Sequence, residues 1–144
     1  MEKDHSLKAF VVLMKATRII EDMLKKEIST YGINLSEFAV LEALYHKGEL
    51  TVQQICQKVL INSGSMTYVI DKLVKKGLLN RKTSAGDRRV YYIQLTNEGR
   101  TFMDDIFPKH EAFISDIFSS LSEEEQEQFI TMMKKVGFSL DPNR

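Results

Sequence analysis

The fold of this chain is decided by residues 50–79, which read LTVQQICQKVLINSGSMTYVIDKLVKKGLL. Thr51 is followed three residues later by Gln54, a capping-box pattern in which the two residues satisfy the first backbone N–H groups of a helix. Apolar residues then recur at helical spacing, at Val52, Ile55 and Val59. The pattern predicts a short helix in the first half of this stretch.

A second helix is predicted directly after the first. Either Asn62 or Ser63 can cap it, and we expect it to run to Lys76, where Gly77 stops it. Its apolar residues gather on one side of a helical wheel, at Met66, Val69, Ile70 and Leu73. We interpret this stripe as core, which leaves the opposite and mostly polar side of the helix exposed.

Two strand-like runs follow, at residues 79–83 and 89–95, and the second run alternates apolar and polar side chains. The turn-rich segment 84–88 between them suits the tip of a hairpin. Two short helices joined by a tight turn and followed by a basic β-hairpin are typical of a winged helix-turn-helix.

Two helices are predicted before this unit. The first covers residues 7–30, and Gly32 is expected in the left-handed conformation that ends many helices. Ser36 is expected to cap the second helix, which ends before Gly48. Both helices carry apolar residues at helical spacing.

Two more helices are predicted after the hairpin. Thr96 caps a helix over residues 97–121, in which Pro108 removes a hydrogen bond and is expected to produce a kink. Ser122 and Glu125 form another capping box, which opens the last helix. The order α-α-α-α-β-β-α-α predicts a mainly α protein with a small β-hairpin wing.

The length of 144 residues is usual for one domain. We expect a single domain, in which residues 36–99 form the winged helix-turn-helix lobe. Residues 1–35 and 100–144 are then dimerisation helices, because long apolar helices at both ends need a surface against which to bury. A symmetric homodimer offers that surface.

The net charge of zero hides an uneven distribution of charge. Residues 58–100 carry nine Lys and Arg against three Asp and Glu, whereas residues 101–144 carry four against nine. A basic middle segment between neutral and acidic ends indicates a local anion-binding surface. A solvated charged face is the alternative, and the helix-turn-helix pattern favours the anion-binding interpretation.

The sequence gives no support for an enzyme, a metal site or a cofactor site. His5, His46 and His110 are scattered and Cys56 stands alone, so no zinc-ligand spacing exists. No phosphate-binding glycine motif and no nucleophile elbow occurs. The apolar runs are too short to span a membrane and no signal peptide is evident, so we expect a cytoplasmic location with no membrane partner.

The outer face of the helix over residues 63–76 is expected to contact double-stranded DNA. Small and hydroxyl-bearing residues near its start allow the backbone to approach base edges in the major groove, while Lys72, Lys75 and Lys76 are expected nearer the phosphates. The full set of expected contacts on the two helices and the first strand is Thr51, Ser63, Gly64, Ser65, Thr67, Tyr68, Lys72, Lys75 and Arg81. Asp71 would be repelled by phosphates, and we expect it to pair with Lys75 one turn later.

The hairpin tip carries Asp87, Arg88 and Arg89, which complete the expected contacts. An arginine at the tip of a hairpin can enter a narrow minor groove, where the negative potential is strongest. Asp87 is expected to hold one guanidinium and so to aim it. A solvated loop with two unconstrained arginines is the alternative.

These motifs together resemble the MarR family of winged-helix bacterial transcription regulators. The resemblance rests on the order and spacing of residues 50–55, 63–67, 73–79, 87–89 and 95–99, and it extends over residues 7–138. It implies an obligate homodimer that binds an inverted-repeat operator, usually as a repressor that a small phenolic compound, a drug or an oxidant releases. Within the family, residues 38–48 and 105–110 are most similar to the hydroquinone-resistance regulators. The alternative is a winged-helix protein-interaction module that does not bind DNA.

Two sensing mechanisms remain open at this point. The resemblance implies a noncovalent pocket for a small aromatic inducer between the dimerisation helices and the DNA-binding lobe, and the candidate residues for it are Phe10, Met14, Tyr45, His46 and Phe107. Cys56 is the possible redox or quinone-adduct sensor. Its position on or beside the buried face of its helix favours a small core side chain instead. The family's peroxide sensors keep a cysteine near the start of the first helix, and this chain has none there.

Overall fold

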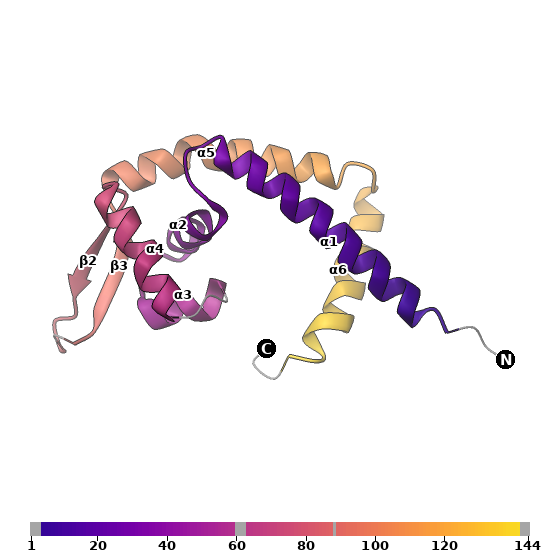
Figure 1. Ribbon diagram of the computed structural model, residues 1–144, viewed down its shortest axis with the longest axis horizontal. Coiled ribbons are helices and arrows are strands. Elements are labelled where there is room, and N and C mark those ends of the chain that lie inside the picture. The colour runs from indigo at the N-terminus through magenta and orange to yellow at the C-terminus, as the bar shows by residue number, and fades with distance from the viewer. Residues whose placement is uncertain (1–3, 60–62, 88, 142–144) are drawn as a thin grey trace. The chain divides into compact units, whose positions relative to one another are not determined.

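The structure is a computed structural model that describes residues 4–59, 63–87 and 89–141 (Figure 1). Over these residues the chain forms six helices and a small antiparallel sheet, which confirms the predicted mainly α fold with a β-hairpin wing. The elements are α1 (Ser6–Ser29), α2 (Leu35–Lys47), β1 (Leu50–Thr51), α3 (Val52–Val59), α4 (Ser63–Lys75), β2 (Leu79–Thr83), β3 (Tyr91–Leu95), α5 (Asn97–Ile117) and α6 (Glu123–Phe138).

The chain divides into two compact units, residues 1–107 and 108–144, and the division falls inside α5 at Pro108. Proline has no N–H group, so the carbonyl of Asp104, four residues earlier, lacks its usual helical partner. The expected kink at Pro108 stays a prediction.

The core of the first unit is built around α4. The inner residues predicted for this helix, Met66, Val69, Ile70 and Leu73, are all buried. They belong to one apolar cluster with residues of α2, α3, the sheet and α5, among them Leu41, Leu44, Ile55, Leu79, Ile93 and Met103. Burying one stripe of α4 in this cluster fixes which side of the helix faces solvent.

The helix-turn-helix begins as the sequence predicts. Thr51 Oγ1 accepts a hydrogen bond from the Gln54 N–H at 3.1 Å, and Gln54 Oε1 accepts one from the Thr51 N–H at 2.9 Å. This reciprocal pair is the expected capping box. The second helix ends at Lys75, one residue before the predicted Lys76, and Gly77 follows with a φ of +80° that residues with a Cβ rarely adopt. Ser63 is its first residue, and Asn62, the other candidate cap, lies outside the described residues.

The sheet has three strands in the order β1-β3-β2, where the sequence predicted only a two-stranded hairpin. The hairpin register pairs Leu79 with Leu95 and Thr83 with Tyr91. The extra strand, Leu50–Thr51, pairs with Ile93 and Tyr92 and joins the start of α3 to the wing. Two residues are too few to show strand alternation, so this strand leaves no periodic signal.

The expected cap of α2 is wrong. Asn34, not Ser36, is the N-cap: its Oδ1 accepts a hydrogen bond from the Glu37 N–H at 2.8 Å. Glu37 Oε1 in turn accepts one from the Asn34 N–H at 3.0 Å, which completes a capping box. A box satisfies two backbone donors, whereas a single Ser cap satisfies one, and this difference favours the earlier start.

The end of α1 is anchored to the core by Ile28, which is fully buried. Beside it, the Tyr31 hydroxyl donates a 2.5 Å hydrogen bond to Glu27 Oε2. Burial, this hydrogen bond and the charges of Glu27 and Asp105 raise the pKa of Tyr31 to about 12. Gly32 follows with a φ of +82°, as predicted for the residue that ends this helix.

The second unit contains the end of α5 and all of α6. The expected capping box is present: the Glu125 N–H donates to Ser122 Oγ, and Glu125 Oε1 accepts from the Ser122 N–H. The turn between the two helices is held by Gln126, whose Nε2 donates to the carbonyls of Phe118 and Leu121 at 3.1 and 3.3 Å. The rings of Phe118 and Phe129 lie 5.8 Å apart.

Gly99 provides a test of how closely α5 packs against the wing. It is buried in the first turns of α5, and a Cβ added there would overlap the carbonyl oxygen of Leu78. We expect Gly99→Ala to lower the free energy of unfolding by about 1–3 kcal/mol, because backbone must move to make room. Urea denaturation followed by circular dichroism measures the change.

The matched control is Gly86→Ala. A Cβ at Gly86 meets no atom within 4 Å, so we expect a change of less than about 0.5 kcal/mol. Equal stability of the two variants would contradict the close contact between Gly99 and Leu78.

Candidate nucleic-acid interface

The outer face of α4 presents most of the expected contact residues to solvent. The exposed side chains are Ser65, Thr67, Tyr68, Lys72 and Lys75, and Ser63 and Gly64 lie in the first turn of the same helix. Tyr68 is 65% exposed, and the Nζ of Lys72 lies 5.7 Å from the centre of its ring. The ring quadrupole attracts a cation that lies above an aromatic ring. The Lys72 ammonium therefore stays beside the exposed Tyr68 ring, and the two form a surface that is both charged and aromatic.

Asp71 does not pair with Lys75 as predicted. Its Oδ1 accepts a hydrogen bond from Arg81 Nη2 on β2, and the two side chains form an ion pair. The wing strand folds back beside α4 and brings a planar guanidinium to the carboxylate, a geometry that a lysine one helical turn away does not offer. The pair neutralises Asp71 and joins the helix to the wing. Arg81, expected as a DNA contact, therefore has a partner within the protein.

Lys76 also departs from its predicted place near the phosphates. Its Nζ lies 2.9 Å from Glu37 Oε2 and 3.4 Å from the carbonyl oxygen of Gly32. The side chain therefore points back along the lobe, toward the start of α2. Nothing in the sequence around Lys76 indicates this partner, because Glu37 lies 39 residues earlier.

At the tip of the wing, Asp87 orients Arg89. Asp87 Oδ1 accepts hydrogen bonds from the Arg89 backbone N–H at 2.9 Å and from its Nε at 3.3 Å. One carboxylate oxygen makes both contacts, and the rest of the guanidinium remains available, with the side chain 91% exposed. Arg88 lies outside the described residues.

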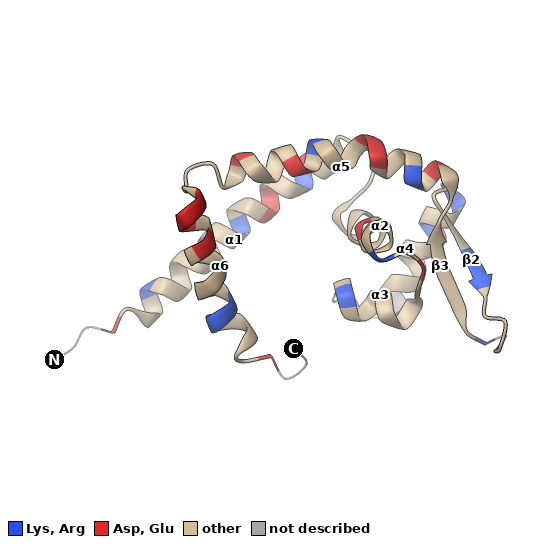
Figure 2. Ribbon diagram, turned by 180° about the vertical axis from the view of Figure 1, so that it is seen from behind, with Lys and Arg blue, Asp and Glu red and all other residues tan. Residues whose placement is uncertain are grey.

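Further basic residues lie on α3 and on the wing strand β2. Figure 2 shows Lys and Arg on α3 and on the wing strand β2, which carry Lys58, Arg81 and Lys82. The Nζ of Lys82 lies 3.8 Å from Oε2 of Glu49, the residue before β1. Thr51, the remaining expected contact, lies at the start of α3, and its hydroxyl oxygen accepts the capping hydrogen bond. The first unit therefore combines an exposed polar helix face with a basic wing.

Three of the five candidate pocket residues lie together. The ring of Tyr45 is 5.4 Å from His46 and 5.6 Å from Phe107, and the last two rings are 4.8 Å apart. The Tyr45 hydroxyl donates a 2.6 Å hydrogen bond to Asp104 Oδ1, and the Arg100 guanidinium lies 5.7 Å from its ring. No sequence pattern points to Asp104 and Arg100, since only the fold brings α5 to α2. Phe10 and Met14 lie on α1 and are exposed.

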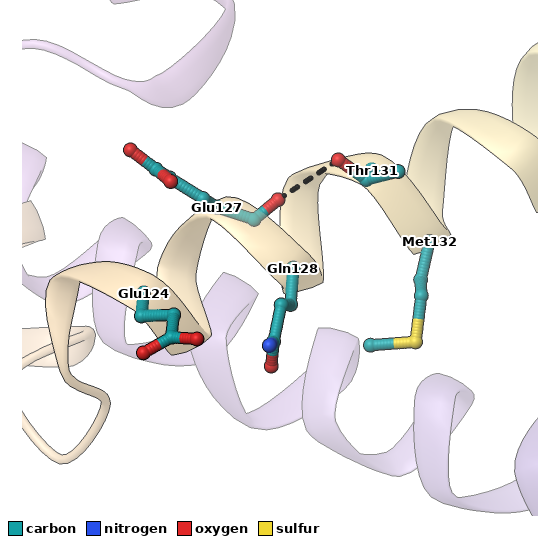
Figure 3. A pocket seen from close by; sticks show the side chains of 5 residues that line it. All are labelled: Glu124, Glu127, Gln128, Thr131 and Met132. Carbon is teal, nitrogen blue, oxygen red and sulfur yellow. Dashed lines mark hydrogen bonds between the residues drawn. The ribbon is translucent and has the colours of Figure 1, made fainter.

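Among the open hollows on the described residues are the following two. One, of about 370 Å³, lies between α2 and α3 and is lined by Ala39, Glu42, Ala43, His46, Lys47, Lys58 and Val59. The other, of about 530 Å³, is lined by Glu124, Glu127, Gln128, Thr131 and Met132 (Figure 3). All five residues of this second hollow belong to α6, and the Thr131 hydroxyl donates a 3.0 Å hydrogen bond to the Glu127 carbonyl. The first hollow contains one candidate pocket residue, His46.

Cys56 is half-buried and packs against the core cluster, in agreement with the predicted place on or beside the buried face of its helix. In the described part of the chain, no group of His, Cys, Asp and Glu is arranged to hold a metal ion. No helix there is long and apolar enough to span a membrane.

Comparison with known proteins decides the family. The chain is 52% identical over 136 residues to the HTH-type transcriptional regulator MhqR of Bacillus subtilis, a match that covers 94% of each chain. Residues 33–91 match the model of the MarR family. The chain belongs to the MarR family. The family expected from the sequence motifs is therefore confirmed.

Solved structures of MarR-family proteins share the fold. Sco3205 of Streptomyces coelicolor, solved in complex with DNA, matches 99% of this chain and 95% of its own with a TM-score of 0.88 at 20% identity. BpsR of Bordetella bronchiseptica, whose DNA binding is regulated by 6-hydroxynicotinic acid, matches 90% and 98% with a TM-score of 0.79 at 22% identity.

The chain is therefore a transcription regulator of the MarR family and not an enzyme, in agreement with its relatives. The exposed face of α4 and the basic wing are the elements of the first unit that can meet a DNA duplex.

Proposed function

We propose that this MarR-family protein is a homodimeric repressor that binds an inverted-repeat operator and is released by a small phenolic or quinone-like compound. The observation that carries the proposal is the combination of a polar, exposed α4 face with an exposed, oriented Arg89 at the wing tip. The similarity to MhqR supports the narrower resemblance to the hydroquinone-resistance regulators.

The two contact surfaces have different expected roles. Ser65 and Thr67 are short side chains on the exposed face of α4, so they suit contacts with base edges in the major groove. Arg89 is held by Asp87 with most of its guanidinium exposed, so it suits the negative potential of a minor groove. Lys72 and Lys75 lie nearer the end of α4 and suit phosphates.

These roles predict different effects of substitution on DNA binding. We expect Arg89→Ala to weaken binding to all duplexes and to reduce the slope of log K against log salt concentration by about one. We expect Ser65→Ala to change the preference at particular base pairs by roughly 1–3 kcal/mol and to leave that slope unchanged. Fluorescence anisotropy with labelled duplexes over a salt series measures both quantities.

Lys47→Ala, an exposed substitution at the end of α2, is the matched control for the loss of a positive charge. An unchanged salt slope in Arg89→Ala would show that Arg89 makes no ionic contact with DNA.

The terminal helices support the homodimer. On α1 the large apolar side chains Leu7, Phe10, Val12, Met14 and Ile19 are all more than half exposed. No residue of α6 is buried, although Ile130, Met132, Val136 and Phe138 are apolar. An apolar surface of this extent indicates an interface, and a second copy of the chain covers both helices with the same kind of surface. Two lobes then place two α4 helices at half-sites about one helical turn, ~34 Å, apart on the operator.

We expect light scattering of the wild-type protein to give twice the 16.6 kDa mass of the chain. Ile130→Glu places a charge on a side chain that is 52% exposed in the single chain, so it leaves the chain folded but prevents burial of this position in a dimer. We expect this variant to shift toward the monomer and to lose operator binding. Gln53→Glu, which adds the same charge on the exposed surface of α3, is expected to remain dimeric. A monomeric wild-type protein at micromolar concentration would refute the dimer.

The aromatic cluster on α2 and α5 supports a noncovalent inducer site. Tyr45, His46 and Phe107 offer ring faces, and Asp104 and Arg100 offer polar groups next to them. A few polar groups beside aromatic walls suit a small phenolic ligand. An inducer that binds the DNA-free arrangement better than the DNA-bound one weakens DNA binding by the same factor.

Cys56→Ser separates this mechanism from thiol chemistry. The substitution is small and removes the thiol, so we expect the variant to fold, to bind the operator and still to release it with methylhydroquinone as the probe. The expected coupling is roughly 1–3 kcal/mol, measured as the shift of duplex affinity with and without the compound. A variant that binds DNA but no longer responds, together with an adduct mass on the wild-type protein, would identify Cys56 as the sensor instead.

A further inference from the structure

We infer that Glu37 and Lys76 form a positioning pair that sets the orientation of α4 on DNA, so that Lys76 determines sequence discrimination and does not contact phosphate. This role goes beyond the proposed repressor function, which needs only that α4 faces DNA. It also assigns a task to a lysine of the basic segment that the sequence pattern placed at the DNA backbone.

Glu37 is only 2% exposed and is the one charged residue that is buried among the described residues. Both of its carboxylate oxygens are used. Oε1 accepts the hydrogen bond from the Asn34 N–H at the start of α2, and Oε2 lies 2.9 Å from Lys76 Nζ. A buried carboxylate needs such partners, because it loses the hydrogen bonds that water would make.

Lys76 reaches this carboxylate from the end of α4. It is the first residue after the helix, where its N–H still donates to the carbonyl of Lys72. Its Nζ also lies 3.4 Å from the Gly32 carbonyl oxygen, in the connection between α1 and α2. One ammonium group therefore joins the end of α4 to the start of α2 and to the preceding turn.

The pair constrains α4 in a way that apolar packing does not. The buried stripe of Met66, Ile70 and Leu73 fixes the side of the helix that faces the core, but apolar contacts are non-directional and allow small shifts along the helix axis. A charge-assisted hydrogen bond has a preferred length and angle. The Glu37 side chain is 3% exposed and the Lys76 side chain 37% exposed, so the pair is half-buried. Ion pairs with a buried partner add little net stability, and in some proteins they select one arrangement over its neighbours.

The orientation of α4 matters most for contacts with base edges. Such contacts require donors and acceptors in register with individual base pairs, whereas contacts with phosphates tolerate small displacements. A shift of α4 is therefore expected to weaken binding to a preferred sequence while binding to random DNA persists. A lysine that contacts phosphate would instead affect both kinds of DNA alike.

The test compares Lys76→Met and Glu37→Gln with the wild-type protein. Glutamine also serves in capping boxes, so Glu37→Gln keeps the start of α2 and removes only the charge. Each protein is titrated, over a salt series, against a duplex that the wild-type protein has selected from a random library and against a random duplex of equal length. Circular dichroism confirms that each variant is folded at the temperature used.

We expect each variant to bind the selected duplex roughly tenfold more weakly, about the effect of one mismatched base pair. Binding to the random duplex and the salt slope are expected to stay as in the wild type. The double variant is expected to be no weaker than either single one, because the two changes remove the same contact. Lys75→Met, one residue earlier and exposed, is the matched comparison and is expected to reduce the slope by about one.

Two results would overturn the inference. A reduced salt slope in Lys76→Met, with weaker binding to both duplexes, would make Lys76 a phosphate contact. An unchanged ratio between the two duplexes would make the pair a contribution to stability alone. If Lys76→Met does not fold, Lys76→Gln and Glu37→Gln are titrated against the same two duplexes instead. A wild-type protein that selects no sequence would refute sequence-specific operator binding itself, and with it any role for this pair in discrimination.

Discussion

The burial of one side of α4 is the constraint on which the rest of the DNA-binding lobe depends. Met66, Ile70 and Leu73 are almost completely buried in a core that α2, α3, the sheet and α5 also share. Because these positions recur at helical spacing, burying them leaves Ser65, Thr67 and Tyr68 on the surface. The same residues that stabilise the fold therefore decide which side chains can meet DNA.

Polar contacts add directional constraints on α4 to those of the apolar core. Asp71 and Arg81 join the exposed side of α4 to the wing, and Glu37 and Lys76 join its end to the start of α2. Each pair matches a negative group with a positive one, so neither carboxylate is presented unpaired to the phosphates. Because hydrogen bonds are directional, two of them at separate points along α4 limit its rotation and its sliding together.

Sequence patterns predicted the features that are local and missed those that depend on distant partners. The capping boxes at Thr51 and Ser122 and the turn at Gly77 were predicted, since each needs only residues within a few positions. The partners of Asp71 and Lys76 were not, because they lie 10 and 39 residues away in the sequence. The wrong cap predicted for α2 has a different cause. Asn34 and Glu37 form a local capping box, three residues apart, that competes with Ser36 for the start of the helix.

The terminal helices and the contact between α2 and α5 follow from the same balance between buried and exposed side chains. The terminal helices keep apolar side chains exposed because a single chain has no further core in which to bury them. The Tyr45–Asp104 hydrogen bond joins α2 of the DNA-binding lobe to α5 just before Pro108, where the helix lacks one backbone hydrogen bond. A ligand beside Tyr45 would therefore act on a contact between α2 and α5 next to the turn that lacks a backbone hydrogen bond. Because Glu37 on α2 also contacts Lys76 at the end of α4, a change at Tyr45 has a physical route to the exposed face of α4, the proposed DNA-contact surface.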